Sequence, residues 1–468
     1  MISINRIPKI IQGGMGAGIS NWKLAKTVSM KGGLGIVAGT ALDQILVRRL
    51  QNGDTDGHMR RALEAFPAPA SARRVLEKWF QPHGNPNRRY RILSKPVCTM
   101  NDARVETMIV AAFVEMFLAK EGHDNPVGFN CLEKMQLPLI PSIFGAMLAG
   151  VDCLTIGAGF PVYIPKVLDN LLSMNPSFIP LHVEGRNIPR HELEFDPHRY
   201  IPDKYRSSLL SKLQRPLFFP IISSPLAGKM MLRKNAHLVD GFIVENHRAG
   251  GHNAPPRTKT SDRPSYGKKD DIDMGAIAAL GKPFWLAGGY ASPEKMREAL
   301  RQGASGVQIG SLFAYSAQSG LDATQKKECL DLFVKNKIVV KTDFAASPTG
   351  YPFKTILKSG TATDPHASLT QERKCDLGYL RTISCDDEGK LVYNCPATNA
   401  DSNALCVCNG LMSAAGLPQM RTETREPPLL TCGEDYAAIA ELASVAGEYT
   451  AEDALNFIRG TLHKRLSA

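Results

Sequence analysis

Short apolar runs alternate with longer amphipathic segments along most of the chain. Each run is about five residues long and rich in aliphatic and β-branched side chains, which is typical of buried strands. The segments between the runs repeat apolar residues every three to four positions, which is typical of helices packed on one face. The expected strands, some running into a glycine-rich turn, occupy residues 8–16, 34–38, 126–130, 151–156, 216–222, 241–245, 282–289 and 306–310.

Helices are expected between these strands, over residues 21–30, 105–120, 140–148 and 226–233. Ser292 and Pro293 suit the N-cap and first position of another helix. Repeated strand–helix units predict a parallel sheet, either doubly wound or closed. Eight such strands favour a TIM (β/α)8 barrel, which we place at residues 1–345.

Three segments do not follow this alternation. Residues 41–95 are charged, proline-containing and mostly helical in pattern, and residues 161–215 include only one further candidate strand, at 180–183. We interpret both as insertions into the barrel. Residues 346–468 form a predicted C-terminal extension packed on the barrel, with a helical end at 434–466. The extension carries six of the ten cysteines: Cys375, Cys385, Cys395, Cys406, Cys408 and Cys432.

Composition narrows the class of protein. The chain has 468 residues with a net charge of +11, partly in arginine pairs such as 60–61, 73–74 and 88–89. Such clusters are more often solvated faces than binding sites, and no nucleic-acid-binding motif accompanies them. The longest apolar run, residues 108–119, is too short and too polar to cross a membrane. Without a secretion signal, ten cysteines indicate reduced thiols in a cytoplasmic protein.

The cysteine spacing predicts no metal site. Cys406 and Cys408 are separated by one residue, and Cys375, Cys385, Cys395 and Cys406 are about ten residues apart. Neither gap fits the pairs that commonly bind zinc or iron–sulfur clusters, so buried small apolar residues are the better interpretation.

Two glycine-rich strand ends could bind a phosphate. They are Ala287-Gly288-Gly289 and Gln308-Ile-Gly310-Ser311, which follow the seventh and eighth expected strands. In a barrel these ends commonly hold phosphates, because glycine leaves backbone N–H groups free to face an anion. Tight turns without a ligand are the alternative.

The stretch from Gly241 to His252 combines a buried strand, a turn with paired glycines and a histidine. Such a turn can hold a titratable group against a flat ligand, although a surface turn is the plainer alternative. Gln12 to Gly16 is also glycine-rich but lacks the features of a dinucleotide fingerprint, and a flat ring over exposed backbone suits it better. Asn130 could donate to and accept from such a ring.

These motifs together resemble the nitronate monooxygenase family, whose FMN-binding barrel is shared with some enoyl-acyl carrier protein reductases. The matching segments occur in the family's order, at 11–15, 32–36, 127–130, 249–252, 287–289 and 306–311. The resemblance implies that His252 acts next to the flavin. It implies FMN contacts from Gly13, Gly14, Met15, Asn130, Gly251, Ala287, Gly288, Gly289, Gln308, Gly310 and Ser311. The insertions, the extension and the proline-rich loop 252–258 depart from the family where substrate would be selected.

The resemblance leads to an expected reaction and to alternatives. We expect an FMN-dependent nitronate monooxygenase that uses O₂ to convert nitronates to carbonyl compounds and nitrite, with His252 as base. His247 competes for that role, although a structural or rim histidine is its plainer interpretation. An NAD(P)H-dependent enoyl thioester reductase and a non-catalytic flavin- or anion-binding module are the alternatives. We expect no nucleic acid or membrane partner, and the sequence leaves the oligomeric state open, a homodimer included.

Overall fold

A closed barrel of eight parallel strands forms the centre of the computed structural model, which describes residues 2–85, 90–185, 190–257, 265–364, 373–399, 402–419 and 425–462. Around the barrel the strand order is β1-β11-β10-β8-β7-β4-β3-β2. Their bounds are β1 Ile10–Gln12, β2 Leu34–Ala38, β3 Val127–Leu132, β4 Cys153–Gly157, β7 Leu217–Ile222, β8 Phe242–Glu245, β10 Phe284–Ala287 and β11 Gly306–Ile309. The predicted TIM barrel is confirmed, and each expected strand is present.

The strands are parallel because each is followed by a crossover that returns the chain to the same end of the barrel. Register places the C-terminal residues of neighbouring strands side by side, as with Glu245 and Ala287 of β8 and β10. Asn130 lies inside β3 rather than at its end, because β3 continues two residues beyond the predicted boundary. The side chains that fill the barrel include Ile11, Phe219 and Trp285, all buried.

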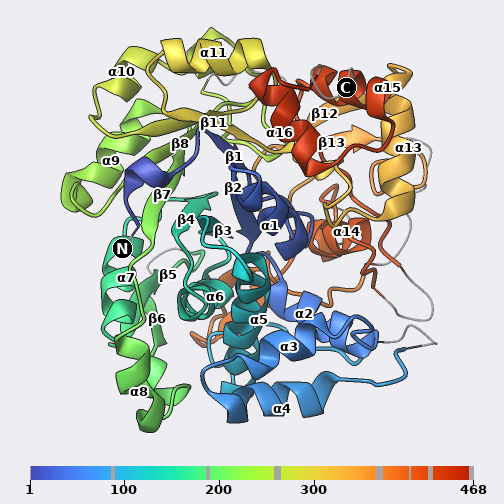
Figure 1. The fold of residues 1–468 in the computed structure, drawn as a ribbon. Helices are drawn as coiled ribbons and strands as arrows, with labels where there is room; N and C mark the ends of the chain where they lie inside the picture. Colours follow the sequence, from blue (N-terminus) through green and yellow to red (C-terminus); the bar gives the residue numbers. More distant parts are fainter. Residues whose placement is uncertain are drawn as a thin grey trace.

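Helices surround this barrel (Figure 1). The predicted helices are present as α1 Trp22–Met30, α5 Asp102–Lys120, α6 Gln136–Leu148, α9 Pro225–Asn235 and α11 Pro293–Arg301. Asn21 and Ser292 cap α1 and α11 by accepting a backbone N–H three residues further on, as expected of such residues. The shorter helices are α10 Met274–Ala278, α12 Ser311–Ala314 and α13 Ala323–Val334.

The first insertion contains α2 Leu42–Gln51, α3 His58–Glu64 and α4 Pro69–Trp79. It joins the main core, because nearly every residue of α2 is buried and α2 packs on α5. The second insertion contains α7 Ile164–Leu172, α8 Asp203–Leu210 and an antiparallel hairpin of β5 Ser177–Leu181 with β6 His191–Phe195. This segment is therefore not purely helical. The candidate strand predicted at 180–183 overlaps β5.

The C-terminal extension contains β13 Phe353–Leu357, β14 Thr382–Cys385, β15 Leu391–Asn394, α14 Val407–Ala414, α15 Ala437–Ala446 and α16 Ala451–Arg459. The predicted helical end is two helices, separated where Gly447 has a φ of 65°. β13 lies between β12 Val339–Asp343 and β9 Gly251–His252, so this sheet crosses the predicted boundary at residue 345. The division into barrel and extension stays a prediction.

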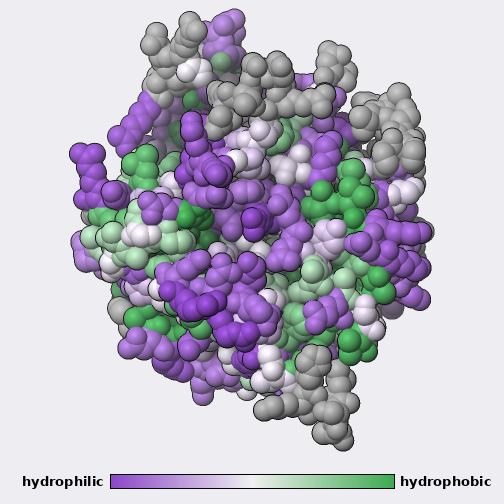
Figure 2. All heavy atoms as spheres, turned by 90° about the horizontal axis from the view of Figure 1, so that it is seen from above, coloured by the Kyte–Doolittle hydropathy of each residue, from purple (hydrophilic) through white to green (hydrophobic). Residues whose placement is uncertain are grey.

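Within the described ranges, 3-10 turns also lie at Ile4–Arg6, Pro197–Arg199, Lys268–Asp270 and Pro396–Thr398. The face at the top of Figure 1, turned toward the viewer in Figure 2, is mainly hydrophilic with scattered apolar patches. No helix in the described ranges has the length and apolar character needed to cross a bilayer. Arg88, Arg89, Thr258 and the last residues of the predicted helical end, 463–466, lie outside those ranges.

Candidate active site

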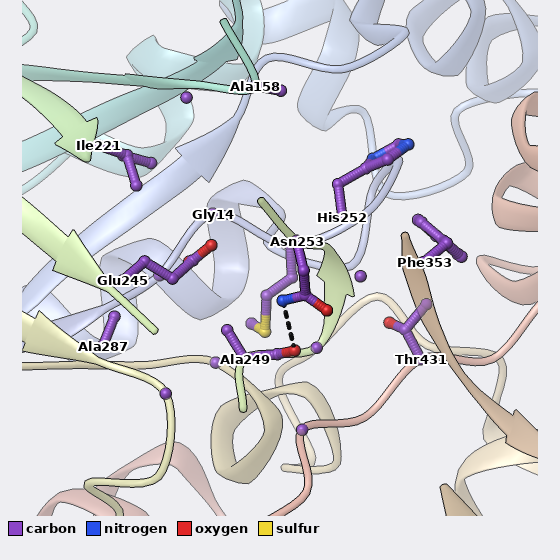
Figure 3. A pocket seen from close by; sticks show the side chains of 18 of the residues that line it. Gly14, Ala158, Ile221, Glu245, Ala249, His252, Asn253, Ala287, Phe353 and Thr431 are labelled. Carbon is purple, nitrogen blue, oxygen red and sulfur yellow. Dashed lines mark hydrogen bonds between the residues drawn. The ribbon is translucent and has the colours of Figure 1, made fainter. Parts of the chain in front are cut away.

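A cavity of about 560 Å³ lies at the C-terminal ends of the barrel strands. Its walls come from loops that are distant in sequence but meet at this end of the barrel (Figure 3). The residues predicted to bind FMN or substrate all line it: Gly13, Gly14, Met15, Asn130, Gly251, His252, Ala287, Gly288, Gly289, Gln308, Gly310 and Ser311.

The glycine turn after β1 is held by the buried side chain of Gln12. Its Nε2 donates to Ser20 Oγ at 2.9 Å, and its Oε1 accepts the N–H of Ile36 at 3.1 Å. A Cβ on Gly14 would lie 2.3 Å from Cβ of Asn130, so only glycine allows this approach. Asn130 Nδ2 donates to Thr155 Oγ1 at 3.0 Å. A second contact, from Nδ2 to the carbonyl of Thr155 at 3.3 Å, occupies the other N–H, so of the donor and acceptor roles predicted for Asn130 the acceptor role of Oδ1 is the one left for a ligand.

The turn after β10 depends on two glycines in the left-handed region. Gly288 has a φ of 93° and Gly289 a φ of 88°. The carbonyl of Gly288 accepts from Asn246 Nδ2 at 2.8 Å, and a Cβ on Gly288 would lie 2.2 Å from Asn246 Oδ1. At the neighbouring strand end, Gln308 Oε1 is buried without a hydrogen-bond partner in the described structure. An unpaired buried acceptor of this kind indicates a ligand donor, since it is otherwise costly.

Two opposite charges flank the predicted phosphate turn. The space that a Cβ on Gly289 would occupy is bordered by Asp435 Oδ2 at 3.6 Å and Arg248 Cδ at 3.7 Å. Arg248 would attract a phosphate, and Asp435 would oppose it. Ser311 Oγ accepts the N–H of Gly433 at 2.8 Å, and its side chain is also hydrogen-bonded to Cys432, so the extension holds this serine at the predicted phosphate turn.

His252 projects from β9, which pairs with β13 of the extension. Its Nε2 lies 2.7 Å from Ser347 Oγ, in a hydrogen bond whose donor depends on the imidazole tautomer. The ring meets Phe353 edge-on, with centroids 4.6 Å apart. Burial, together with the positive charge of Lys134, lowers the pKa of His252 to about 3. The imidazole is therefore neutral at physiological pH.

Glu245 was not among the predicted site residues. It is the last residue of β8, and its carboxyl group faces the cavity between Ile221 of β7 and Ala287 of β10 (Figure 3). Burial raises the pKa of Glu245 to about 7. The sequence signal was an acidic residue ending an otherwise apolar barrel strand, which is a position where barrels place functional side chains.

His247 also lines the cavity. Its ring stacks on Tyr266 with centroids 4.5 Å apart and an interplanar angle of 12°. Its Nδ1 is buried and has no hydrogen-bond partner in the described structure. His247 therefore stays a second candidate for contact with a ligand, in addition to its stacking role.

The extension contributes an apolar wall that sequence reasoning missed. We call this set the extension wall: Leu377, Tyr379, Leu380, Val407, Cys408, Leu411, Ala414, Leu429, Leu430 and Ile439. No local motif marks these positions, because each is an ordinary apolar residue that faces the cavity only through the fold. These lining residues could not be predicted from the sequence, because only tertiary packing brings them to the cavity.

All ten cysteines are free thiols. Within the part of the chain that the structure describes, no group of three or more histidine, cysteine or acidic side chains is arranged to hold a metal ion. Burial raises the pKa of several of these thiols, including Cys131, Cys153 and Cys408. Such thiols are poor nucleophiles and behave as small apolar side chains.

No family model and no curated protein matches the chain. Solved structures similar to it include FabK from Thermotoga maritima, with 15% identity, a TM-score of 0.48 and coverage of 98% of this chain and 94% of that chain. They also include a nitroalkane oxidase from Streptomyces ansochromogenes, with 13% identity, a TM-score of 0.46 and coverage of 98% and 97%.

The enoyl reductase domain of MlnA, from the macrolactin biosynthesis cluster of Bacillus amyloliquefaciens, is 11% identical with a TM-score of 0.38 and coverage of 76% and 64%. The similar structures thus include both kinds of protein that the motifs resemble. At these identities and TM-scores the likeness supports no assignment of activity. The fold assignment rests on the barrel strands themselves, and any function must be argued from the cavity.

Proposed function

We propose that the protein is an FMN-dependent oxidoreductase that oxidises alkyl nitronates with O₂ to carbonyl compounds and nitrite. The observation that carries this proposal is the convergence of the glycine turns, Asn130, Gln308 and His252 on one cavity at the functional end of a barrel. These residues are far apart in sequence, and they are the ones by which the chain resembles the nitronate monooxygenase family.

The residues of the cavity fit a flavin mononucleotide. Gly288, Gly289, Gly310 and Ser311 would hold the phosphate, with Arg248 nearby and Asp435 opposing it. Gly13, Gly14 and Met15 would lie against the ring or ribityl chain, and the unpaired Gln308 Oε1 would accept a hydrogen bond. Bound FMN would supply the redox chemistry, while the protein supplies position and proton handling.

His252 would accept the proton when the substrate arrives as a neutral nitroalkane. Its low pKa keeps the imidazole in the proton-accepting form throughout the physiological pH range, although it also makes the imidazole a weak base in the empty cavity. A nitronate anion forming beside the ring would raise that pKa by stabilising the imidazolium. A preformed nitronate needs no base, which makes nitronates the favoured substrates.

An enoyl thioester reductase is the second candidate. The extension wall favours it, because an apolar surface beside the strand ends suits a longer hydrocarbon chain than a short nitronate carries. In that reaction NAD(P)H would be the reductant and His252 would donate a proton or orient the thioester. A non-catalytic binding module is the least supported alternative, since it leaves the enclosed histidine without a role.

One experiment separates these proposals. The purified protein is loaded with FMN, its spectrum is recorded, and it is mixed anaerobically with a propyl nitronate or with NADPH. Nitronate oxidation predicts rapid flavin bleaching by the nitronate and little by NADPH. Bleaching by NADPH, followed by reoxidation with an enoyl thioester, would establish the reductase instead. Failure to bind FMN would rule out both enzymes.

A further inference from the structure

Glu245 presents a half-buried carboxyl group to the cavity. It forms no hydrogen bond or ion pair with any described residue, whereas Arg257 and Asp270, which also line the cavity, are both bonded. Ala287 pairs with Glu245 across the adjacent strand β10, and Ile221 of β7 lies near its side chain, and neither residue can offer a charge or a side-chain donor (Figure 3). A carboxylate left in such surroundings is costly, so the group keeps its proton to a higher pH than usual.

The charged and titratable groups on the other walls do not neutralise Glu245. Arg257 donates to the carbonyls of Lys269 and Ser223, and its N–H is bonded to Asp270. His252 is bonded to Ser347, and Asp435 borders the phosphate turn. The charged or histidine side chains lining the cavity from these elements are His247, Arg248, His252, Arg257, Asp270 and Asp435. None of them lies within ion-pair distance of Glu245 in the described structure.

We infer that Glu245 is a second proton-handling residue of this cavity, and that it must hold its proton for an anionic cofactor or substrate to bind. The inference rests on the proposed function, because FMN and nitronates are both anions. As a neutral acid, Glu245 donates a hydrogen bond to an acceptor atom of the ligand. As a carboxylate, it has no proton to donate and repels the negative charge in a site of low dielectric.

The proton balance follows from this role. When the free protein carries Glu245 as carboxylate, binding of one FMN takes up one proton from solvent, which ends on the Glu245 carboxyl group. No bond within the ligand is made or broken. Because burial raises the pKa of Glu245 to about 7, the neutral form predominates below that pH and the carboxylate above it. FMN affinity therefore falls as the pH rises through neutrality.

FMN binding to the apoprotein tests this, with flavin fluorescence as the readout at constant ionic strength. The dissociation constant of the wild type is expected to rise about tenfold between pH ~7 and pH ~8.5. The phosphate of FMN, with a second pKa of about 6, changes little in that interval. Glu245→Gln keeps a neutral donor of the same shape, so its dissociation constant should change less than about twofold.

His247→Gln is the matched control, because it removes the other titratable side chain that follows the same barrel strand. If the profile of Glu245→Gln matches that of the wild type, the pH effect belongs to another group, such as Lys134, whose pKa burial lowers to about 8, and the inference is wrong. Circular dichroism checks that each variant is folded.

Calorimetry on the wild-type protein tests the predicted proton uptake directly. FMN binding at pH ~8, measured in two buffers of different ionisation enthalpy, should take up about 0.9 proton per site. Tight binding with no proton uptake would overturn the inference and leave the proposed function intact. Absence of FMN binding at every pH would instead overturn the proposed function and this inference together.

Discussion

The barrel end and the C-terminal extension build the same cavity by different means. The barrel supplies glycine turns, amides and titratable groups, including Glu245 and His252, at the ends of short rigid strands. The extension supplies mainly apolar side chains from an irregular segment and two helices, α14 and α15. We expect the polar half to bind the proposed cofactor and to transfer protons, and the apolar half to select the substrate.

The two parts meet at His252, since β9 pairs with β13 of the extension. The histidine is therefore positioned by the extension as much as by the barrel strand that precedes it. The difference shows that local motifs can identify candidate catalytic residues, whereas the position and the environment of those residues depend on a segment distant in sequence. The predictions that follow separate the contributions of the two parts.

The largest effect is expected on the barrel side, at His252. His252→Ala should lower kcat/KM for a neutral nitroalkane by at least about 100-fold, because proton transfer by a positioned base contributes roughly 10² to 10⁴. A preformed nitronate should lose less than about tenfold, since it needs no base. Steady-state oxygen consumption with both substrates measures the two ratios.

His247→Ala is the matched control for this prediction, and a smaller loss is expected there. Because the pKa of His252 is lowered to about 3, the wild type should lose no activity through this group between pH ~8 and pH ~5. Equal losses for nitroalkane and nitronate would contradict the base role.

Breaking the connection between the two parts is expected to destabilise the protein. Lys354 has no exposed side-chain surface and donates to Thr342 Oγ1 at 2.7 Å and to Glu434. Lys354→Ala should lower the free energy of unfolding by about 2 kcal/mol, because it removes a buried side chain and leaves the Thr342 hydroxyl without its partner, while Glu434 stays partly solvated. Chemical denaturation monitored by circular dichroism measures the change.

Lys341→Ala, on the adjacent strand, removes an exposed lysine and should change stability by less than about 0.5 kcal/mol. A similarly small effect at Lys354 would show that its bonds to Thr342 and Glu434 contribute little to stability.

Changing the extension wall should alter substrate preference and leave cofactor binding unchanged. Leu411→Trp places a larger side chain against the cavity, so kcat/KM for a hexyl nitronate should fall about tenfold relative to an ethyl nitronate. Val445→Trp, at an exposed position of the same extension, should leave this ratio unchanged. If neither variant changes the ratio of kcat/KM between the two substrates, the extension wall does not select substrate.

The smallest effect is expected at Asp435, the acidic residue that the extension places beside the phosphate turn. Asp435→Asn removes a like charge and should tighten FMN binding by about threefold at low ionic strength, with less gain as salt screens the interaction. Asp387→Asn, at an exposed position of the extension, is the control and should have no effect. Weaker FMN binding to Asp435→Asn would mean that Asp435 holds the turn through its hydrogen-bonding capacity.

Much of the barrel could be predicted from local sequence. Runs such as Leu34–Ala38 and the first three residues of β8, Phe242 to Val244, are apolar because strands of a closed parallel barrel are buried on both faces. Ser292 before Pro293 fixed the start of α11, and the paired glycines marked the turn after β10. Periodicity, caps and turn chemistry act over a few residues, so the sequence shows them directly.

The composition of the cavity could be predicted only in part. Gly288 and His252 were found because their motifs are local, whereas Leu411, Leu430 and the other apolar residues of the extension carry no mark of their position. Residues far from the barrel in sequence reach the site through packing that no short pattern encodes. The shifted pKa values of His252 and Glu245 likewise arise from burial.

By itself, then, the sequence determined the eight strands, the glycine turns and His252 as the candidate base. Only the tertiary structure decided that Asn130 is already bonded to Thr155, that Glu245 faces the cavity unpaired, and that the extension closes the site. The physical reason is that backbone propensity and capping are local, whereas desolvation and pairing depend on every neighbour that folding brings within a few ångströms.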